Sequence, residues 1–241
     1  MNTSLAFPRA GKSLANGQPT SIPHPALQQL TASTLLGIPP RPAGLYYLGA
    51  EFNPTHGIMP IVSVPGRSPF ILATTERDGA DDLLALAYTA ALTATALGQA
   101  DPLVVTAEPE SWKHVVRQDR ILLPIQFKQA IPYLQKHRPG NRKHGLIIID
   151  NICQEFDITA EDLLGLAVSP YISLLVTAVP EYAAPLAHSI QSARLVIGNL
   201  SRQQSRAVLG NIPPLEQQLT YGHFAVRQQS RWLVFSTITQ Y

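Results

Sequence analysis

The sequence predicts an α/β protein built on a mostly parallel sheet with helices on both faces. From Gly44 onward, short apolar runs alternate with longer stretches of helical character, which is typical of strand–helix–strand units. A hairpin-like pair of runs precedes this alternation, and a second pair closes the chain. No internal repeat interrupts the pattern, so the observations together favour one α/β domain.

The length and composition of the chain limit its class. With 241 residues, it is long enough for one α/β domain with a good core and a tail, but short for two domains. A net charge of +2 is far from the concentrated charge of a protein that coats nucleic acid. The lone cysteine, Cys153, suits a reducing compartment, and no apolar run approaches the roughly 20 residues that span a bilayer. We therefore expect a cytoplasmic protein without membrane insertion.

The composition changes once along the chain, near residue 43. Residues 1–43 are rich in Pro, Ser, Thr and Gly, with one short helical candidate at Pro25 to Leu36, and predict a partly extended N-terminal arm. Residues 44–241 are expected to form the folded domain. Apolar residues of the arm are too sparse for a core and suit a segment that orders on a protein partner: Leu5, Phe7, Ile22, Leu27, Leu30, Leu35 and Leu36.

Each element of the domain is predicted from its own run of residues. The first hairpin-like pair is GLYYLGAEF with GIMPIVSV, and the closing β-hairpin is YGHFAVRQQ with SRWLVFSTI. Apolar runs predict core strands at residues 70–74, 103–106, 120–124, 145–150, 172–177 and 194–197. The stretches between them predict helices at residues 79–97, 125–137, 160–167, 181–192 and 202–209, with Pro132 expected to bend the second.

The turn after the first core strand has the position of a phosphate-binding loop without its chemistry. Such a loop reads G-x-x-x-x-G-K-[ST], and its lysine reaches the phosphates. This turn has no lysine and four acids; its residues are Thr74, Thr75, Glu76, Arg77, Asp78, Gly79, Ala80, Asp81 and Asp82. Because a helix N-terminus attracts anions, we expect Asp81 or Asp82 to cap the following helix from within and to repel a triphosphate.

A second pattern, LIIIDN, lies at the end of the strand predicted at residues 145–150. Four apolar residues followed by Asp150 form a Walker B pattern, in which the acid faces the ligand crevice and holds Mg²⁺. Buried parallel strands that end in Asp are also common, so a strand end whose acid caps a turn remains an alternative.

The order and spacing of several segments resemble the motor domain of the FtsK/SpoIIIE branch of the HerA/FtsK ATPases, from about Gly44 to the C-terminus. That family typically reads LG-x-D-x-x-G-x-P before its first core strand, where this chain has LGAEFNPTHGIMPIVSV. Its Walker B strand and its next strand, which reads like LILATQRP, correspond to LIIIDN and SLLVTAVP. The most specific match is ARLVIGNLSRQQSRAVLG, Ala193 to Gly210, which aligns without a gap with family segments of the type ARIAFRVSSRTDSRTILG. The resemblance implies a RecA-like P-loop fold.

The chain departs from the family pattern at four catalytic positions. The phosphate-loop lysine is missing, and the glutamate expected after Asp150 is Asn151, which cannot act as a general base. Ala178 stands at the position of the sensor glutamine, and Gly198 stands where the family has an arginine. Because these parts act as a unit in phosphoryl transfer, we expect no ATP binding, no Mg²⁺-dependent hydrolysis and no cofactor.

Two groups of basic residues are candidate contact sites. Arg202 and Arg206 are neighbours on one helix face and are candidates for a subunit interface; solvated surface arginines are an equally good interpretation. The run KHRPGNRKH is a candidate nucleic-acid contact, although a charge run, like the earlier KHVVRQDR, is usually a solvated face. The candidate residues in it are Lys136, Arg138, Arg142 and Lys143.

Histidines and large aromatic residues carry less weight. His137 and His144 lack a ligand partner at metal spacing, so no metal site is predicted. The aromatic residues Tyr46, Tyr47, Trp112 and Trp232 are assigned to core or hairpin packing rather than to stacking on bases.

Three functional classes follow from these observations. The favoured one is an inactive FtsK-like module that acts as a binding, scaffold or regulatory subunit of a larger assembly, with a protein partner or an oligomer. The second is a DNA-binding protein of a plasmid, phage or mobile element, and the third is an atypical active DNA-translocating ATPase. Nucleotide titration separates the third class from the others, and a salt-dependent DNA shift separates the second.

Overall fold

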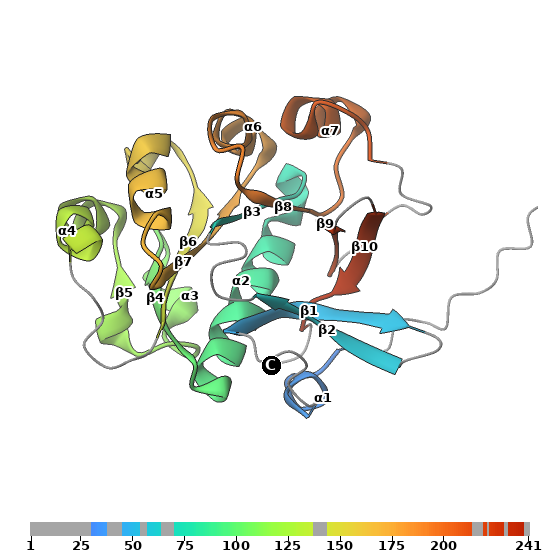
Figure 1. Cartoon of the computed structure of the whole chain (residues 1–241), viewed down its shortest axis with the longest axis horizontal. Coiled ribbons are helices and arrows are strands. Elements are labelled where there is room, and N and C mark those ends of the chain that lie inside the picture. Colours follow the sequence, from blue (N-terminus) through green and yellow to red (C-terminus); the bar gives the residue numbers. More distant parts are fainter. Residues whose placement is uncertain are drawn as a thin grey trace, which may run out of the picture.

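One mixed sheet of ten strands runs through the part of the chain that the structure, a computed structural model, describes. This part comprises residues 30–37, 45–53, 57–63, 70–136, 144–213, 219–220, 222–228 and 231–238. The strand order is β2-β1-β10-β9-β8-β3-β7-β6-β4-β5 (Figure 1). The strands are β1 Tyr46–Asn53, β2 Gly57–Ser63, β3 Phe70–Thr74, β4 Ala100–Val105, β5 Ile121–Leu122, β6 His144–Ile152, β7 Ile172–Ala178, β8 Arg194–Ile197, β9 His223–Gln228 and β10 Arg231–Ser236.

The six strands from β8 to β5 are parallel, and the remaining four are antiparallel. In the parallel part, Thr74 at the end of β3 pairs with Ala178 of β7 on one side and with Ile197 of β8 on the other. In the antiparallel part, β8 pairs with β9, β9 with β10, β10 with β1 and β1 with β2. The α/β fold class with a mostly parallel sheet is therefore confirmed, and the two predicted hairpins form its antiparallel side.

Helices cover both faces of the sheet (Figure 1). They are α1 Ala32–Leu36, α2 Ala80–Leu97, α3 Pro109–Trp112, α4 Pro124–Lys136, α5 Ala160–Ala167, α6 Pro180–Ser189 and α7 Arg202–Leu209, with single 3₁₀ turns η1 Arg77–Gly79, η2 Gln118–Arg120 and η3 Gln154–Phe156. The long helix α2 packs on one face, and α4 to α7 pack on the other. Strands β3 and β7 are buried along their whole length, because both of their faces are covered.

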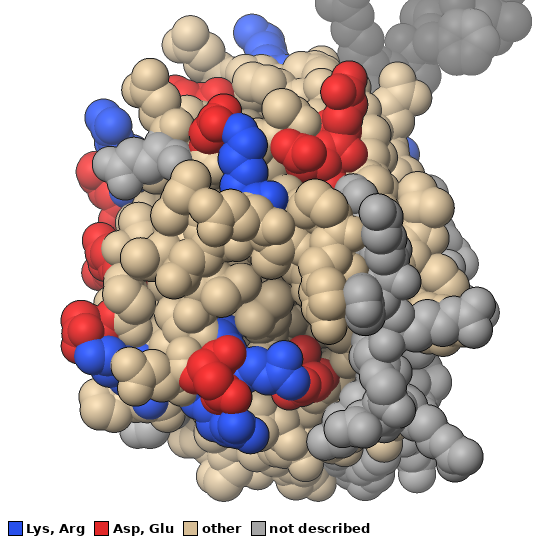
Figure 2. Space-filling view, turned by 90° about the vertical axis from the view of Figure 1, so that its left-hand side faces the viewer, with Lys and Arg blue, Asp and Glu red and all other residues tan. Residues whose placement is uncertain are grey.

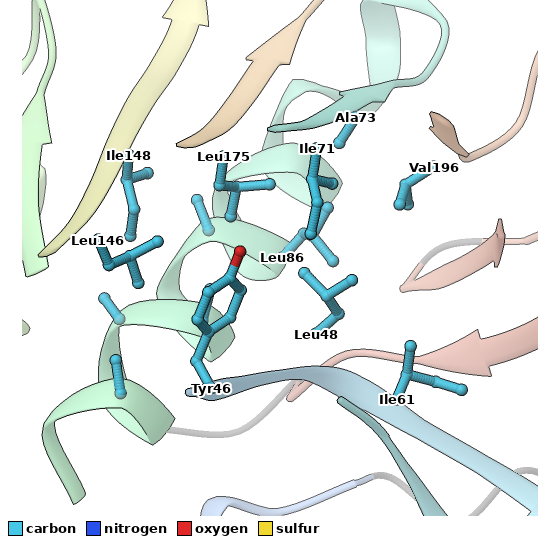
Figure 3. Close-up of a cluster of buried hydrophobic side chains, with 14 of the residues drawn as sticks. Tyr46, Leu48, Ile61, Ile71, Ala73, Leu86, Leu146, Ile148, Leu175 and Val196 are labelled. Carbon is cyan, nitrogen blue, oxygen red and sulfur yellow. The ribbon is translucent and has the colours of Figure 1, made fainter. Parts of the chain in front are cut away.

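The core under α2 joins the parallel and the antiparallel parts of the sheet. Figure 3 shows Tyr46 and Leu48 of β1 meeting Leu86 of α2 and residues of the central strands, among them Ile71 and Leu175. All five side chains are fully buried. At roughly 1.5–3 kcal/mol for each large apolar side chain removed from water, this cluster is a main source of stability.

Two threonine hydroxyls tie the antiparallel strands to α2. The Thr93 hydroxyl accepts a 2.9 Å hydrogen bond from the Tyr47 amide of β1. The Thr89 hydroxyl accepts a 3.0 Å hydrogen bond from the Ile238 amide, just after β10. Buried amides need such partners, so α2 positions both terminal parts of the described chain.

Several predicted boundaries need correction. Strands β3 and β8 and helices α5 and α7 have the predicted bounds, but the strand predicted at residues 120–124 is only Ile121–Leu122. Arg120 closes the turn η2, and Pro124 begins α4, where its fixed φ and missing amide are favourable. The helix predicted at residues 181–192 begins at Pro180 for the same reason and ends at Ser189, because Ile190 leaves the helical conformation.

The end of the predicted arm belongs to the folded core. Leu30 and Leu35 are buried against Tyr47, Ala50 and Ile238, so the expectation that these two leucines stay outside a core is wrong. The helix predicted from Pro25 is α1, whose Thr31 side chain caps its first turn. Residues 1–29 and 38–44, with the other apolar residues of the arm except Leu36, lie outside the described residues.

Candidate functional site

Four neighbouring strands bring the degenerate catalytic positions to one edge of the sheet. Ala178, at the end of β7, pairs with Thr74 of β3 and with Ile152 of β6. The turn after β3, the acid near the end of β6, and Gly198 after β8 all lie at this carboxyl edge. This edge is where ligands bind in open α/β sheets, and the positions of the four departures lie together along it.

The turn between β3 and α2 is short and internally bonded. Thr75 is fully buried, and the single 3₁₀ turn η1 leads directly into the helix. The Gly79 amide donates to the Glu76 carbonyl at 2.9 Å, and the Glu76 amide donates to the Asn199 carbonyl at 2.7 Å. Two amides that a phosphate loop would present to its ligand are therefore bonded to protein oxygens.

The loop after β8 covers this turn. The Gly198 amide donates to the Thr74 carbonyl at 2.7 Å, and the Thr75 hydroxyl donates to the Asn199 carbonyl at 3.1 Å. The Asn199 side-chain amide donates to the Glu76 carboxylate. A Cβ at residue 198 would lie 2.6 Å from the Thr75 hydroxyl oxygen. This close approach leaves little room for a side chain at residue 198.

Asp82 does not cap its own helix, contrary to expectation. Its carboxylate accepts a 2.9 Å hydrogen bond from the Gly222 amide, which precedes β9 and lies 140 positions away. Helix α2 begins after Gly79, where no side chain caps it. Burial raises the pKa of the Asp82 carboxyl, and the Gly222 amide opposes that shift. The helix thus begins beside a buried acid that holds the last hairpin, while Asp81 is exposed.

Asp150 is enclosed by hydrogen-bond donors of the protein. The Trp112 indole N–H donates to its carboxylate at 2.8 Å, the Thr106 hydroxyl at 3.2 Å and the Thr177 hydroxyl at 3.5 Å. Burial raises the pKa of Asp150, and the Trp112 and Thr106 donors counteract this rise. In this geometry Asp150 is a buried acid near the end of β6 whose carboxylate is held by three side-chain donors.

Trp112 connects the Asp150 site to α2. It is fully buried, and its ring meets the edge of the Tyr88 ring with centroids 4.7 Å apart at 90°. The Tyr88 hydroxyl donates in turn to the Ser111 carbonyl. The assignment of Trp112 to the core is correct, but its bond to Asp150 was not predicted. A buried indole N–H usually needs an acceptor, and this was the only available signal.

Asn151 occupies a strained backbone position. Its φ is +51°, in the left-handed region that asparagine tolerates better than most residues. The pairing of β6 with β7 shifts register between Ile149 and Ile152, and the Asn151 amide donates to the Thr177 hydroxyl at 2.7 Å. The side chain at the family's glutamate position is therefore exposed and turned out of the regular ladder.

The two arginines proposed for an interface lie on α7, directly after the loop that covers the turn. Arg202 and Arg206 are both exposed. The helix is fixed at its start by a capping box, in which Ser201 and Gln204 bond each other's backbone amides. A rigid short helix therefore presents both guanidinium groups to solvent beside the degenerate site.

The basic runs differ in how much the structure says of them. Lys113, Arg117 and Arg120 of the first run form ion pairs with Glu110, Asp119 and Asp101, respectively, which supports a solvated surface. Figure 2 shows the face over α4 and β5, where basic and acidic groups are intermixed around an uncharged centre. In the second run, Arg138, Arg142 and Lys143 and the Lys136 side chain lie outside the described residues.

Within the described ranges, no group of three or more His, Cys, Asp or Glu side chains has the geometry to hold a metal ion. Among the helices of the same ranges, none is long and apolar enough to cross a bilayer.

Comparison with known proteins identifies the fold but no family. No family model and no curated protein matches the sequence. Among solved structures, EccC (ATPases 2 and 3) of Thermomonospora curvata in complex with a signal sequence peptide aligns over 88% of this chain and 43% of its own, with 11% identity and a TM-score of 0.63. The cytoplasmic domain of EssC aligns over 88% and 47%, with 11% identity and a TM-score of 0.63.

A third structure, the cytoplasmic domain of the Thermomonospora curvata type VII secretion ATPase EccC, aligns over 85% of this chain and 28% of its own, with 13% identity and a TM-score of 0.61. The chain thus spans less than half the length of each of these proteins. At such low identities the likeness establishes architecture alone. The described residues have the fold of P-loop ATPase domains, as the resemblance in the sequence implied.

Proposed function

We propose that this chain is a degenerate FtsK/SpoIIIE-type domain that does not bind or hydrolyse ATP and acts as a binding, scaffold or regulatory subunit of a larger assembly. The observation that carries the proposal is the internal bonding of the turn after β3. A phosphate loop binds its ligand through free amides and a lysine. Here the amides of Glu76 and Gly79 already donate to backbone carbonyls, and no lysine is present.

Opening this turn to a phosphate would be costly. The loop at Gly198 and Asn199 would have to leave, with loss of hydrogen bonds worth about 1 kcal/mol each. The incoming phosphate would also approach the buried carboxylate of Asp82 and the partly exposed carboxylate of Glu76, and the low local dielectric strengthens the repulsion at the buried one. Both effects oppose nucleotide binding.

The arrangement at Asp150 supports the same conclusion. A Walker B acid serves Mg²⁺ through lone pairs that face the ligand crevice. The Asp150 carboxylate instead accepts two bonds on Oδ2, from Trp112 and Thr106, and one on Oδ1, from Thr177, so a metal would have to compete with these donors. With Asn151 after it in place of a glutamate, the site also lacks a group to activate water.

The comparisons support an assembly role. The structures of EccC and EssC named above contain ATPases 2 and 3 or the cytoplasmic domain, and one of them is a complex with a signal sequence peptide. This chain corresponds in size to a fraction of each. We propose that it takes the place of one such domain in a protein assembly, with Arg202 and Arg206 at a contact with a neighbouring subunit.

Nucleotide titration tests the inactivity. The melting temperature of the protein should not rise as ATP and Mg²⁺ are increased to millimolar concentrations, because a ligand that binds the native state must stabilise it. An active P-loop ATPase measured in parallel serves as the positive control. A rise that follows the ATP concentration, or Mg²⁺-dependent phosphate release, would support the atypical ATPase instead.

The assembly role is tested by recovery of partners from the native cell. Changing Arg202→Ala together with Arg206→Ala should reduce partner recovery or change the oligomeric state, whereas Gln203→Ala on the same helix should not. Unchanged recovery with the arginine variant would exclude this contact.

DNA binding remains the second candidate, favoured by the basic run before β6. Charge reversal at its four basic residues, Lys136, Arg138, Arg142 and Lys143, should abolish a salt-dependent DNA shift if this function is correct. Our preferred proposal predicts no such shift with the unmodified protein at physiological salt.

A further inference from the structure

A groove lies on the face of the sheet opposite α2, between the end of β6, the start of α5 and α6. Its volume is about 420 Å³, within the range of sites that hold ligand groups. The apolar part of its lining is Ile152, Ile158, Pro185 and Leu186, with the ring of Tyr182 and the thiol of Cys153. Tyr182 and Pro185 are exposed, so the groove is open to solvent.

The groove lies in an acidic part of the chain. Residues 145–193 contain six Asp or Glu residues and no Lys or Arg. Asp157 lines the groove and remains largely exposed although Lys128 pairs with it. Glu161 in the first turn of α5 and Glu181 in the first turn of α6 are also exposed. A cationic segment is therefore the electrostatic complement of this surface.

Residues 1–29 of the same chain have the composition that fits this groove. They contain Arg9 and Lys12 and no acid, and the segment Leu5 to Arg9 reads LAFPR, with Phe7 and Pro8 next to the cation. Proline-rich segments dock in grooves lined by aromatic and proline side chains, because they bind in an extended form that already has low entropy. We infer that residues 5–12 of one copy dock in the β6–α5–α6 groove of a second copy, with Phe7 among the apolar side chains and Arg9 and Lys12 near the acids.

The position of the described start of the chain favours a second copy as the acceptor. Leu30 is buried with Tyr47 and Ile238, in a cluster at the antiparallel part of the sheet. The groove lies at the parallel part, beside α5 and α6 (Figure 1). Twenty-nine extended residues span at most about 100 Å, and an arm that reached the groove of its own copy would have to order many of them along its own surface. Docking on a neighbour avoids that cost and makes a head-to-tail contact, which closes into a ring or extends as a filament.

The inference concerns an oligomer contact and does not depend on whether the turn after β3 binds nucleotide. Its test uses Cys153, which is the lone cysteine of the chain, is partly exposed and lines the groove. A full-length variant with Phe7→Cys and Cys153→Ser is mixed with unmodified protein under mild oxidation. We expect a disulfide-linked dimer between residue 7 of the variant and Cys153 of the unmodified chain.

A control variant places the new thiol at an exposed position in the turn η2, with Gln118→Cys and Cys153→Ser, and should form little or no linked dimer with the unmodified chain. Adding Glu161→Lys and Glu181→Lys to the chain that supplies Cys153 should lower the yield of the linked dimer several-fold, as should high salt. Equal yields from the residue 7 and residue 118 thiols would overturn the inference, because they would indicate random collision.

A chain that carries both Phe7→Cys and the native Cys153 tests the alternative that residues 5–12 dock in the groove of their own copy. If it forms only an internal disulfide that migrates as a monomer, the acceptor is the same copy and the inference of a second copy is wrong. A second test needs no added cysteine. If residues 5–12 cover the groove of a second copy, labelling of Cys153 by a thiol reagent should slow as the protein concentration rises. The slowing should disappear with Arg9→Glu and Lys12→Glu, and labelling that is independent of concentration would contradict the docking.

Discussion

The Trp112 indole N–H donates a 2.8 Å hydrogen bond to the buried carboxylate of Asp150, and so joins the short helix after β4 to the end of β6. Replacing Trp112→Phe removes this donor and leaves the carboxylate with weaker partners. Loss of one partner of a buried charged group costs about 1–3 kcal/mol, so the free energy of unfolding, measured by urea denaturation, should fall by about that much. In an Asp150→Asn background the same change should cost clearly less, because no charge is left underbonded. An equal cost in both backgrounds would mean that Trp112 contributes by packing alone.

Asp82 should make the stability of the protein depend on pH. Burial raises the pKa of this carboxyl above the value of about 3.8 that it has when unperturbed. Between these two values the native state retains a proton that the unfolded state has released. The free energy of unfolding therefore holds its full value at lower pH and falls as the pH rises through this window.

The matched variants for Asp82 are two asparagine replacements in one helical turn. Asp82→Asn keeps an oxygen for the Gly222 amide and removes the charge, so it should flatten this part of the pH profile and raise the stability at neutral pH relative to the unmodified protein. Asp81→Asn, at an exposed position, should leave the profile nearly unchanged. Chemical denaturation at a series of pH values distinguishes them, and identical profiles for both variants would refute the role of burial.

Gly198 should not tolerate even a methyl group. A Cβ there would lie 2.6 Å from the Thr75 hydroxyl oxygen and 2.7 Å from the Thr75 Cβ, so the covering loop or the turn must move. Such overpacking costs about 1–3 kcal/mol, which a thermal or urea unfolding curve of Gly198→Ala will show. Gly145→Ala is the control, because the nearest atom to its Cβ would be 3.4 Å away. If both alanines are equally harmless, the loop at Gly198 does not hold the turn closed as described.

Truncation of the N-terminal arm should have two distinct stages. Removing residues 1–29 leaves Leu30 and Leu35 in place and should leave the free energy of unfolding nearly unchanged. Removing residues 1–37 takes both leucines out of the cluster with Tyr47 and Ile238, and should cost about 3 kcal/mol or more from lost apolar burial. Circular dichroism during urea denaturation measures both, and equal stability of the two truncated proteins would contradict the packing of α1.

The sequence predicted elements well wherever a local run of residues determines them. Strands β3 and β8 have the predicted bounds because their apolar runs stop at Thr74 and before Gly198, respectively. Helix α7 has the predicted bounds because Ser201 and Gln204 form a capping box at its start. Helix α3 was not predicted, since its four residues are too few for a periodic pattern. Boundaries at Pro124 and Pro180 were placed one residue late, although proline at the first helical position is itself a start signal.

The contacts of the candidate site were beyond the reach of sequence patterns. The order and spacing of the segments that resemble the family single out the turn after β3, Asp150, Ala178 and Gly198, which lie at one edge of the sheet. They gave no information that Asp82 would bond an amide 140 residues later, or that Trp112 would bond Asp150. Such pairs depend on tertiary packing, and neither residue of a pair has a sequence pattern around it that would reveal its partner. The role of Gly198 was likewise hidden, because it follows from how closely Thr75 approaches.

The pairing of β1 with β10 affects how the protein folds during synthesis. Ala50 lies opposite Ser236, so β1 joins the rest of the sheet through a strand that is made 186 positions later. The parallel strands leave the ribosome before β10 is made. Until then, the edge of β1 that pairs with β10 has no partner strand. Contacts between such distant parts of a chain form slowly, and unpaired edges are prone to aggregation. Chaperone dependence of expression should therefore fall in a circular permutant that places β1 and β2 after β10.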